Sequence, residues 1–178
     1  MDLNKIPIGQ NPPEDVNVII EVPLRGEPVK YEVDKASGAM YVDRFLHTAM
    51  HYPVNYGFIP HTLSDDGDPV DVMVIGRLAV AVGAVMRVRP IGVMKMQDEA
   101  GMDEKILAVP HTKLHPYHDN VLHYKDMRPT ELHRIEHFFT HYKDLEEDKW
   151  TKILGWGDPN EACEMINKAI EAAKADKG

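Results

Sequence analysis

The segment AVMRVRPIGVMKM, Ala84–Met96, is the longest of several stretches in which β-branched and apolar residues predominate. This composition, bounded by clusters of Gly, Pro and Asp, is typical of β-strands. Five further stretches of this kind lie between residues 16 and 110, namely VNVIIEV (16–22), VKYEV (29–33), AMYVDRF (39–45), VDVMVI (70–75) and KILAV (105–109). Short strands in succession, without helical periods between them, predict a closed or highly curved antiparallel barrel.

The chain after residue 110 is predicted to be helical. The segment PTELHRIEHFFTHYKDLE has the apolar spacing of an amphipathic helix that begins near Pro129, with Leu132, Ile135, Phe138, Phe139 and Tyr142 on its apolar face. A second helix is predicted in DPNEACEMINKAIEAAKA, where Asp158 can cap, Pro159 suits the first position and Glu161 completes a capping-box spacing. The predicted fold is therefore α+β, a small barrel with two C-terminal helices in a single domain over residues 1–178.

Composition and charge restrict the class of protein. The chain is 43% apolar, which argues against disorder, and its single Cys163 suits a reducing compartment. No signal peptide is evident at the amino terminus, and the longest apolar run, nine residues from Leu78, is too short to span a bilayer. We therefore expect a soluble cytoplasmic protein without a membrane partner. The net charge of −9 disfavours a nucleic-acid-binding face but allows an anionic substrate accompanied by metal ions.

The stretch SDDGDPVDVMV, Ser64–Val74, places four carboxylates within seven residues, directly before an apolar segment. Like charges this close repel one another and resist leaving water, so a cation is needed to compensate them. Gly67 and Pro69 predict a sharp turn. Period-two alternation then places Asp71 and Met73 on one face of the following strand and its valines on the other. An aspartate at the start of such a strand is a good candidate cation ligand.

A polar turn is the commoner origin of an isolated Asp-Gly-Asp, so the metal hypothesis depends on the rest of the chain. An EF-hand counted from Asp66 fails, because its fifth and sixth positions are Val70 and Asp71 instead of an oxygen ligand and glycine. A second acidic group flanks Gly101 at a predicted hairpin tip and comprises Asp98, Glu99, Asp103 and Glu104. If the two turns converge at one mouth of the barrel, an oxygen-only ligand set would favour Mg²⁺ or Mn²⁺.

Taken together, these segments resemble the soluble inorganic pyrophosphatases of the first family, the Mg²⁺-dependent bacterial type. DGDPVDV, residues 66–72, fits the family signature Asp-x-Asp-Pro-x-Asp followed by an apolar residue. The likeness covers nearly the whole chain in the expected order, through VIIEVP (18–23), KYEVDKASG (30–38), VDRF (42–45), YPVNYGFIPHTLS (52–64), RPIGVMKMQDEAG (89–101), AVPHTKL (108–114) and HFFTHYKDLE (137–146). The resemblance implies a five-stranded, OB-like barrel with flanking helices.

The resemblance also implies metal ligands and a reaction. Asp66, Asp71 and Asp103 would hold the first Mg²⁺, with Asp71 bridging to a second ion. Asp98 and Asp103 would hold a metal that arrives with the substrate, and Glu21 and Glu32 would serve outer sites. Several Mg²⁺ ions would bind each subunit, Mn²⁺ or Zn²⁺ could substitute, and Ca²⁺ would inhibit. The implied reaction is hydrolysis of pyrophosphate to two orthophosphates by a metal-activated water.

The remaining implied roles concern the proton and the phosphates. Asp68 would be the general base beside the nucleophilic water, and Tyr56 would line the pocket near it. The side chains that would bind the phosphates are Lys30, Arg44, Lys105, Tyr142 and Lys143. For a bacterial chain of this length the resemblance further implies a homohexamer, a dimer of trimers. Without metal, mutual repulsion should raise the pKa values of some of the clustered carboxyls.

Two other functions remain open from the residues. A different metal-dependent phosphatase or nucleotide hydrolase would use the same ions, although a pocket rich in Lys, Arg and Tyr favours a small inorganic substrate. An OB-type nucleic-acid module would need a basic, aromatic face, against which the net acidity counts. His133, His137 and His141 recur every four residues on the first predicted helix. Packing against a neighbour or another subunit is favoured for them over binding of a transition metal.

Overall fold

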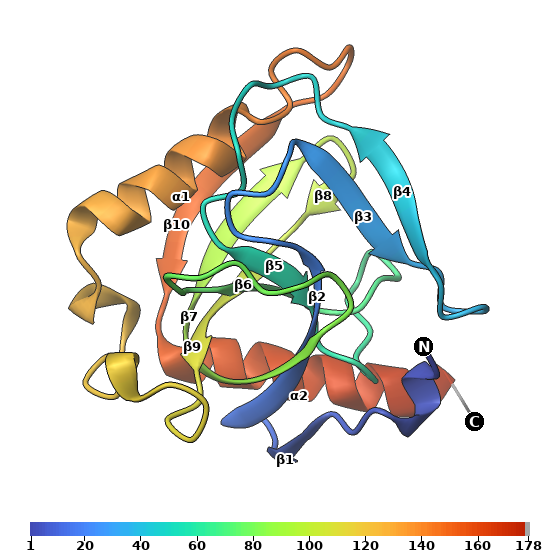
Figure 1. The fold of residues 1–178 in the computed structure, drawn as a ribbon, viewed down its shortest axis with the longest axis vertical. Coiled ribbons are helices and arrows are strands. Elements are labelled where there is room, and N and C mark those ends of the chain that lie inside the picture. Colours follow the sequence, from blue (N-terminus) through green and yellow to red (C-terminus); the bar gives the residue numbers. More distant parts are fainter. Residues whose placement is uncertain (177–178) are drawn as a thin grey trace.

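The computed structural model describes residues 1–176, and its centre is a closed ring of five strands (Figure 1). The ring runs from β2 through β5, β6, β9 and β7 and back to β2. The bounds of these strands are β2 Asp15–Val22, β5 Asn55–Phe58, β6 Asp71–Val74, β7 Val85–Asp98 and β9 Lys105–Pro110. The α+β class and the predicted small barrel are confirmed.

One pairing in this ring differs from the expected antiparallel arrangement. β9 turns back from β7 and lies between β7 and β6, so it runs antiparallel to β7 but parallel to β6. The other ring pairings are antiparallel. This arrangement brings the first residues of β6 and β9, Asp71 and Lys105, to the same end of the ring.

The remaining strands extend the ring or lie beside it. β1 (Gly9–Asn11) pairs with β2, and both β8 (Gly101–Met102) and β10 (Thr151–Gly157) pair with β7. β3 (Val29–Val33) and β4 (Met40–Phe45) form a separate two-stranded sheet, which projects on the right of Figure 1. This hairpin forms one wall of the cavity described below.

Two α-helices and three short 3₁₀ helices complete the fold: α1 (Pro129–His141), α2 (Pro159–Asp176), η1 (Leu3–Lys5), η2 (Pro116–His118) and η3 (Tyr124–Asp126). The start of α1 at Pro129 and its apolar face are confirmed, because Ile135, Phe138 and Phe139 are buried. The predicted cap of α2 is also confirmed. The Asp158 Oδ1 accepts hydrogen bonds from the N–H groups of Asn160 and Glu161 at 2.8 and 3.0 Å.

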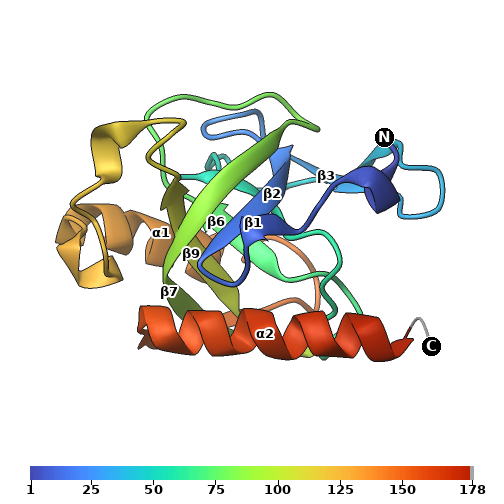
Figure 2. The same cartoon turned by 90° about the horizontal axis from the view of Figure 1, so that it is seen from below.

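The two helices cover different faces of the ring, and Figure 2 shows α2 along one side of it. In β6, Val72 and Val74 belong to the apolar cluster that contains Ile166 of α2, whereas Met73 belongs to the cluster that contains Phe138 of α1. The predicted alternation of this strand is thus confirmed. Each fully buried side chain of this size contributes about 1.5–3 kcal/mol by leaving water, so both helices are held mainly by their apolar contacts.

The prediction that the chain after residue 110 is wholly helical is wrong, because residues 151–157 form β10. The segment TKILGWG carries two glycines, and its register with β7 shifts between Ile153 and Gly155, where Gly155 has a φ of 132°. This bulge interrupts the alternation that would have marked a strand. No helix within residues 1–176 is long and apolar enough to cross a membrane.

Candidate active site

A cavity of about 940 Å³ lies between the ring, the β3–β4 hairpin and the end of α1. Its lining includes every residue that the sequence predicts as a site residue, which are Glu21, Lys30, Glu32, Arg44, Tyr56, Asp66, Asp68, Asp71, Asp98, Asp103, Lys105, Tyr142 and Lys143. The structure therefore brings together side chains from seven strands, two turns and the residues after α1. We call this the acidic cavity.

The first acidic turn is shaped by its own backbone. The Ser64 N–H donates to the Asp68 carbonyl oxygen at 2.7 Å, and the Asp68 N–H donates to the Asp66 carboxylate at 2.9 Å. Gly67 adopts a φ of 89°, a left-handed conformation that costs a residue with a Cβ more than it costs glycine. The turn ends at Asp71, the first residue of β6. It thus presents carboxylates to the cavity from both sides of the glycine.

The second acidic turn is the predicted hairpin. Asp98 ends β7 and pairs with Gly101 of β8, and Asp103 follows β8 directly. Carboxylates of both turns line the acidic cavity, so the predicted convergence is confirmed. Glu104, at the same tip, lines an adjoining cavity that shares Asp66, Asp71 and Asp103 with the acidic cavity.

Lys105 is the centre of the charge arrangement. Its ammonium donates to Asp71 at 2.8 Å, to Asp103 at 2.7 Å and to the Tyr56 hydroxyl at 3.0 Å, and the side chain is almost wholly buried. The Tyr56 hydroxyl also donates to the Asp71 carboxylate. Burial alone would lower the pKa of Lys105, but Asp71, Tyr56 and Asp103 hold it well above the usual value. One positive charge therefore lies between two carboxylates.

Lys143 is the buried lysine that binds the carboxylates of the second acidic turn, as Lys105 binds Asp71 and Asp103. Its ammonium donates to Asp98 at 2.8 Å and to Glu99 at 3.1 Å, and the side chain is also buried. Burial opposes ionisation of Asp98, but the hydrogen bonds from Lys143 and from the Ala100 N–H keep its pKa below the usual value. Lys143 thereby keeps the Asp98 carboxylate charged.

The acidic cavity fits divalent cations. Burial is the largest cause of the raised pKa of Asp66, and repulsion from Asp68, Asp71 and Asp103 adds to the rise. The donors are oxygen atoms only, the type that Mg²⁺ and Mn²⁺ prefer. As arranged, no three His, Cys, Asp or Glu side chains among residues 1–176 form a group able to hold an ion. Between the carboxylates of Asp71 and Asp103 lies the Lys105 ammonium, which donates a hydrogen bond to each of them.

Glu21 is a buried carboxyl in the lining of the acidic cavity. Its carboxylate accepts a hydrogen bond from the Val33 N–H at 2.9 Å. Burial raises the pKa of Glu21 to about 8, and the nearby Asp71 adds to the rise, although the Val33 N–H opposes it. Glu21 is therefore largely protonated at neutral pH when no cation is bound.

We expect Glu21→Gln to stabilise the metal-free protein at alkaline pH. Because the carboxyl titrates near 8 in the folded state but near 4.5 when unfolded, the unfolded state binds fewer protons between these values. The free energy of unfolding of the wild type therefore falls as pH rises from about 4.5 to 8. Glutamine lacks this titration and can still accept the Val33 N–H.

Urea unfolding in EDTA at pH 5 and pH 9 measures this effect, with Glu27→Gln, at an exposed glutamate, as the matched control. The gain of Glu21→Gln over wild type should be small at pH 5 and a few kcal/mol at pH 9. An equal gain at both pH values would contradict the assignment.

The β3–β4 hairpin supplies the outer cations. Lys30 and Arg44 are register partners on the two strands, and both side chains line the acidic cavity. Lys30 pairs with Glu32, and lies 3.4 Å from Asp43. Arg44 lies 3.3 Å from Asp43 and 3.4 Å from Glu146. Two of the carboxylates that pair with these cations, Asp43 and Glu146, are not among the predicted site residues.

Comparison with known proteins identifies the family. A family model described as inorganic pyrophosphatase matches residues 18–174. The chain is 72% identical over 177 residues to the inorganic pyrophosphatase of Rhodospirillum rubrum, covering 99% of each chain. It is 62% identical over 171 residues to that of Caulobacter vibrioides, covering 96% of this chain and 97% of the relative. This chain belongs to the inorganic pyrophosphatase family.

Solved structures agree with this family assignment. The crystal structure of an inorganic phosphatase from Anaplasma phagocytophilum superposes with a TM-score of 0.93 at 54% identity, covering 96% of this chain and 99% of the other. The inorganic pyrophosphatase of Helicobacter pylori superposes with a TM-score of 0.92 at 43% identity, with the same coverage. The fold of this inorganic pyrophosphatase family member is thus that of its bacterial relatives.

Sequence reasoning missed several residues of the cavity in this pyrophosphatase family member, and three of them contact the predicted site residues directly. The Lys35 ammonium donates to the Asp68 carboxylate at 2.6 Å. Tyr52, almost wholly buried, packs against Tyr56 with ring centroids 5.4 Å apart, and Asp43 pairs with Arg44. Lys35 lies two residues beyond a predicted strand and Tyr52 stands alone before Pro53, so neither belonged to the two acidic turns that marked the site. Asp43 precedes Arg44 in the segment VDRF (42–45), but as a single aspartate outside both acidic turns it was not predicted as a site residue.

Proposed function

We propose that this protein hydrolyses inorganic pyrophosphate to two orthophosphates with a water activated by Mg²⁺, and that Asp68 is the general base. As a member of the inorganic pyrophosphatase family, the chain is an enzyme, a hydrolase of pyrophosphate. The observation that carries the proposal is the meeting of two acidic turns with buried Lys105 and Lys143 in one cavity. Such a cavity can hold metal ions and a dense anion together.

The acidic residues would hold several Mg²⁺ ions. In this proposal Asp66, Asp71 and Asp103 bind one ion, Asp98 acts with Asp103 on an ion that accompanies the substrate, and Glu21 and Glu32 serve outer positions. Divalent ions, when bound, make water more acidic and neutralise phosphoryl oxygens. Burial, and then the charges of Asp68, Asp71 and Asp103, raise the pKa of Asp66, and a bound cation would favour its ionised form.

Asp68 is suited to accept the proton of the nucleophilic water. Its side chain is 73% exposed, and its carboxylate binds only the Lys35 ammonium among residues 1–176. A carboxylate that is so little engaged by the protein can orient a water molecule and remove its proton. Tyr56, which is held by Asp71 and Lys105, would form the wall beside that water.

The cationic residues would bind the phosphates. Lys30 and Arg44 lie on the hairpin wall, and Lys105, Tyr142 and Lys143 lie on the inner walls of the cavity. Because their positions are fixed before the reaction, they can stabilise the charge that moves to the leaving phosphate without reorganising. Lys30, Arg44, Tyr56 and Asp68 are the residues that we assign to catalysis.

Substrate choice is the sharpest test against another phosphatase or a nucleotide hydrolase. The aromatic rings of Tyr52, Tyr56 and Phe139 are buried against one another, so these three rings offer little surface to stack a base, and Tyr41 on the hairpin is the exposed ring of the lining. Initial rates of phosphate release should therefore be far higher with pyrophosphate than with ATP at equal Mg²⁺. Equal rates with the two substrates would favour a nucleotide hydrolase.

Ca²⁺ is expected to bind the acidic cavity and inhibit. Its bonds to oxygen are longer than those of Mg²⁺, ~2.3–2.6 Å against ~2.0–2.1 Å. Asp66, Asp71 and Asp103 would then set the nucleophilic water at a poorer angle to phosphorus, and a displacement of ~1 Å can cost ~10²-fold in rate. Titration of Ca²⁺ into the Mg²⁺-activated enzyme should suppress phosphate release. Full activity in a large excess of Ca²⁺ would oppose this account of the geometry.

We further propose a homohexamer, a dimer of trimers, that weakens in acid. His133, His137 and His141 are exposed along α1, and the rings of the last two lie 4.8 Å apart. Histidines gain positive charge between pH 8 and pH 5, so a contact between subunits that covers this row would be weakened by repulsion. Sedimentation velocity should show dissociation over this range, whereas a single unchanged species would speak against it.

The remaining parts of the proposal concern location and partners. We infer that the protein works in the cytoplasm and binds neither nucleic acid nor membranes. The single Cys163 has no disulfide, and the net charge of −9 would repel a nucleic-acid backbone.

A further inference from the structure

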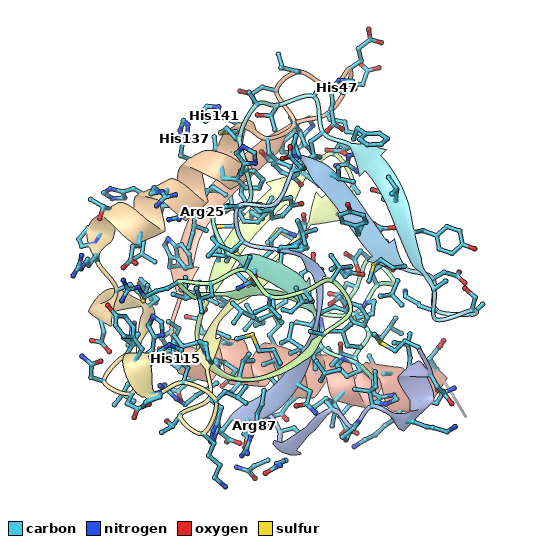
Figure 3. All side chains as sticks on the ribbon, viewed as in Figure 1. Arg25, His47, Arg87, His115, His137 and His141 are labelled. Carbon is cyan, nitrogen blue, oxygen red and sulfur yellow. The ribbon has the colours of Figure 1, made fainter. Side chains whose placement is uncertain are left out.

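A second cavity, of about 320 Å³, lies between the loop after β2, the loop after β6 and the first turns of α1. It shares no lining residue with the acidic cavity. Three arginines from these three segments line it, and we call it the arginine cavity; they are Arg25, Arg77 and Arg134. Figure 3 places Arg25 beside α1. The catalytic proposal uses none of these residues.

The three guanidinium groups have no acidic partner. Within residues 1–176 none of them forms an ion pair or a hydrogen bond with a carboxylate, although the chain carries a net charge of −9. Glu131 is the one acidic residue in the lining, so the formal charge of the lining is +2. Arginines of an acidic protein usually pair with carboxylates, because the planar guanidinium group can donate two parallel hydrogen bonds to a carboxylate. The arginine cavity is therefore a local positive site on an acidic protein.

Two of these arginines are held in place by features that leave their N–H donors available. The Arg77 guanidinium lies 4.9 Å from the centre of the Tyr117 ring, a cation–π contact that orients the planar group without consuming its donors. Arg25 has a φ of 57°, which is uncommon for a residue with a long side chain. Its backbone N–H donates to the Tyr52 carbonyl oxygen at 2.9 Å, so the guanidinium donors are not used in this contact. A strained residue at a cavity is a reason to look for a ligand.

The remaining lining favours a small, multiply charged anion. The three arginines are exposed, whereas Leu24, Ile75 and Ile135 in the same lining are buried apolar residues that offer no competing polar groups. The volume is at the lower end of the range for small-molecule sites, roughly 300–1,000 Å³. Three guanidinium groups can together offer several paired donors, which suits the tetrahedral oxygens of a phosphate better than a single carboxylate.

We propose that the arginine cavity is a second anion site that binds a phosphate group without a metal ion. The group could be orthophosphate, pyrophosphate or the phosphate end of a nucleotide, which share the same recognition chemistry. This site shares no lining residue with the acidic cavity, and binding there would need no metal ion. It therefore does not depend on the catalytic assignment.

The test is isothermal titration calorimetry of the whole protein in EDTA, with three separate probes: orthophosphate, imidodiphosphate and ATP. The variants are Arg134→Gln and the double variant Arg25→Gln/Arg134→Gln. The charge-matched control is Lys152→Gln, an exposed lysine outside both cavities. We expect wild type and control to bind at least one probe equally. Arg134→Gln should bind it at least about tenfold more weakly, because a hydrogen bond to a charged group is worth that much or more. The double variant should not bind it measurably.

The same variants separate this proposal from the hydrolytic one and from a contact between subunits. Their Mg²⁺-dependent rates with pyrophosphate should equal the wild-type rate, since neither arginine lines the acidic cavity. Absence of saturable binding to wild type, or equal binding to wild type and the double variant, would overturn the proposal. It would also be overturned if the double variant bound the anion normally but sedimented as a smaller species in phosphate-free buffer. The arginines would then hold a second copy of the chain.

Discussion

Asp68→Asn should lower the rate of pyrophosphate hydrolysis by ~10²–10⁴-fold, the usual contribution of a general base, while binding of the tightest metal ion stays nearly normal. Asparagine keeps the shape of the side chain but cannot accept the proton. The carboxylate is exposed and bound by Lys35 alone among residues 1–176, so its loss should barely affect folding. Steady-state phosphate release and calorimetric titration with Mg²⁺ measure the two quantities.

Asp71→Asn is the matched variant for this measurement. Asp71 lies at the start of β6, where its carboxylate accepts from Tyr56 and Lys105, and we assign it as a bridging metal ligand. Its loss should weaken Mg²⁺ binding together with activity. The separation of roles fails if Asp68→Asn and Asp71→Asn bind Mg²⁺ with the same affinity.

Lys105→Met should destabilise the metal-free protein by about 3–5 kcal/mol, the typical cost of removing one partner from a buried ion pair. Methionine fills similar space but leaves the carboxylates of Asp71 and Asp103 facing each other, and leaves the Tyr56 hydroxyl without its donor. Added Mg²⁺ should restore part of the lost stability, because a cation can again lie between the carboxylates. Urea unfolding with and without Mg²⁺ measures both effects.

The control for Lys105→Met is Lys168→Met, which breaks an exposed pair with Asp65. The side chains of this pair are 71% and 87% exposed, so its loss should change stability by about 1 kcal/mol or less. A loss for Lys105→Met no larger than that of the control would mean that the buried ammonium does not balance the carboxylates.

The sequence predicted most of the ring because its long strands are continuous in composition. β7 and β9 are rich in apolar and β-branched residues, and the helices carry clear starts at Pro129 and Asp158. β5 was not predicted, because it has only four residues and includes a glycine. That Gly57 is required by close packing: a Cβ there would lie 1.9 Å from the Ile19 carbonyl oxygen. The parallel pairing of β6 with β9 depends on contacts distant in sequence, which no local pattern reveals.

The residues that line the acidic cavity were easiest to predict where charge is concentrated, and their roles in binding and catalysis stay predictions. The two acidic turns stand out by repulsion alone, and the family resemblance supplied the scattered cations. The contacts of Lys105 with Asp71, Asp103 and Tyr56 needed the structure, because they join residues of different strands. The burial that raises the pKa of Glu21 to about 8 likewise depends on packing around the ring.

The central claim is that this protein hydrolyses pyrophosphate through metal ions held by its two acidic turns. The most direct test is phosphate release from pyrophosphate in Mg²⁺, then in excess EDTA, then after Mg²⁺ is restored. We predict rapid release in Mg²⁺, none above background in EDTA, and full recovery when Mg²⁺ returns. Release that continues at full rate in excess EDTA would contradict the account.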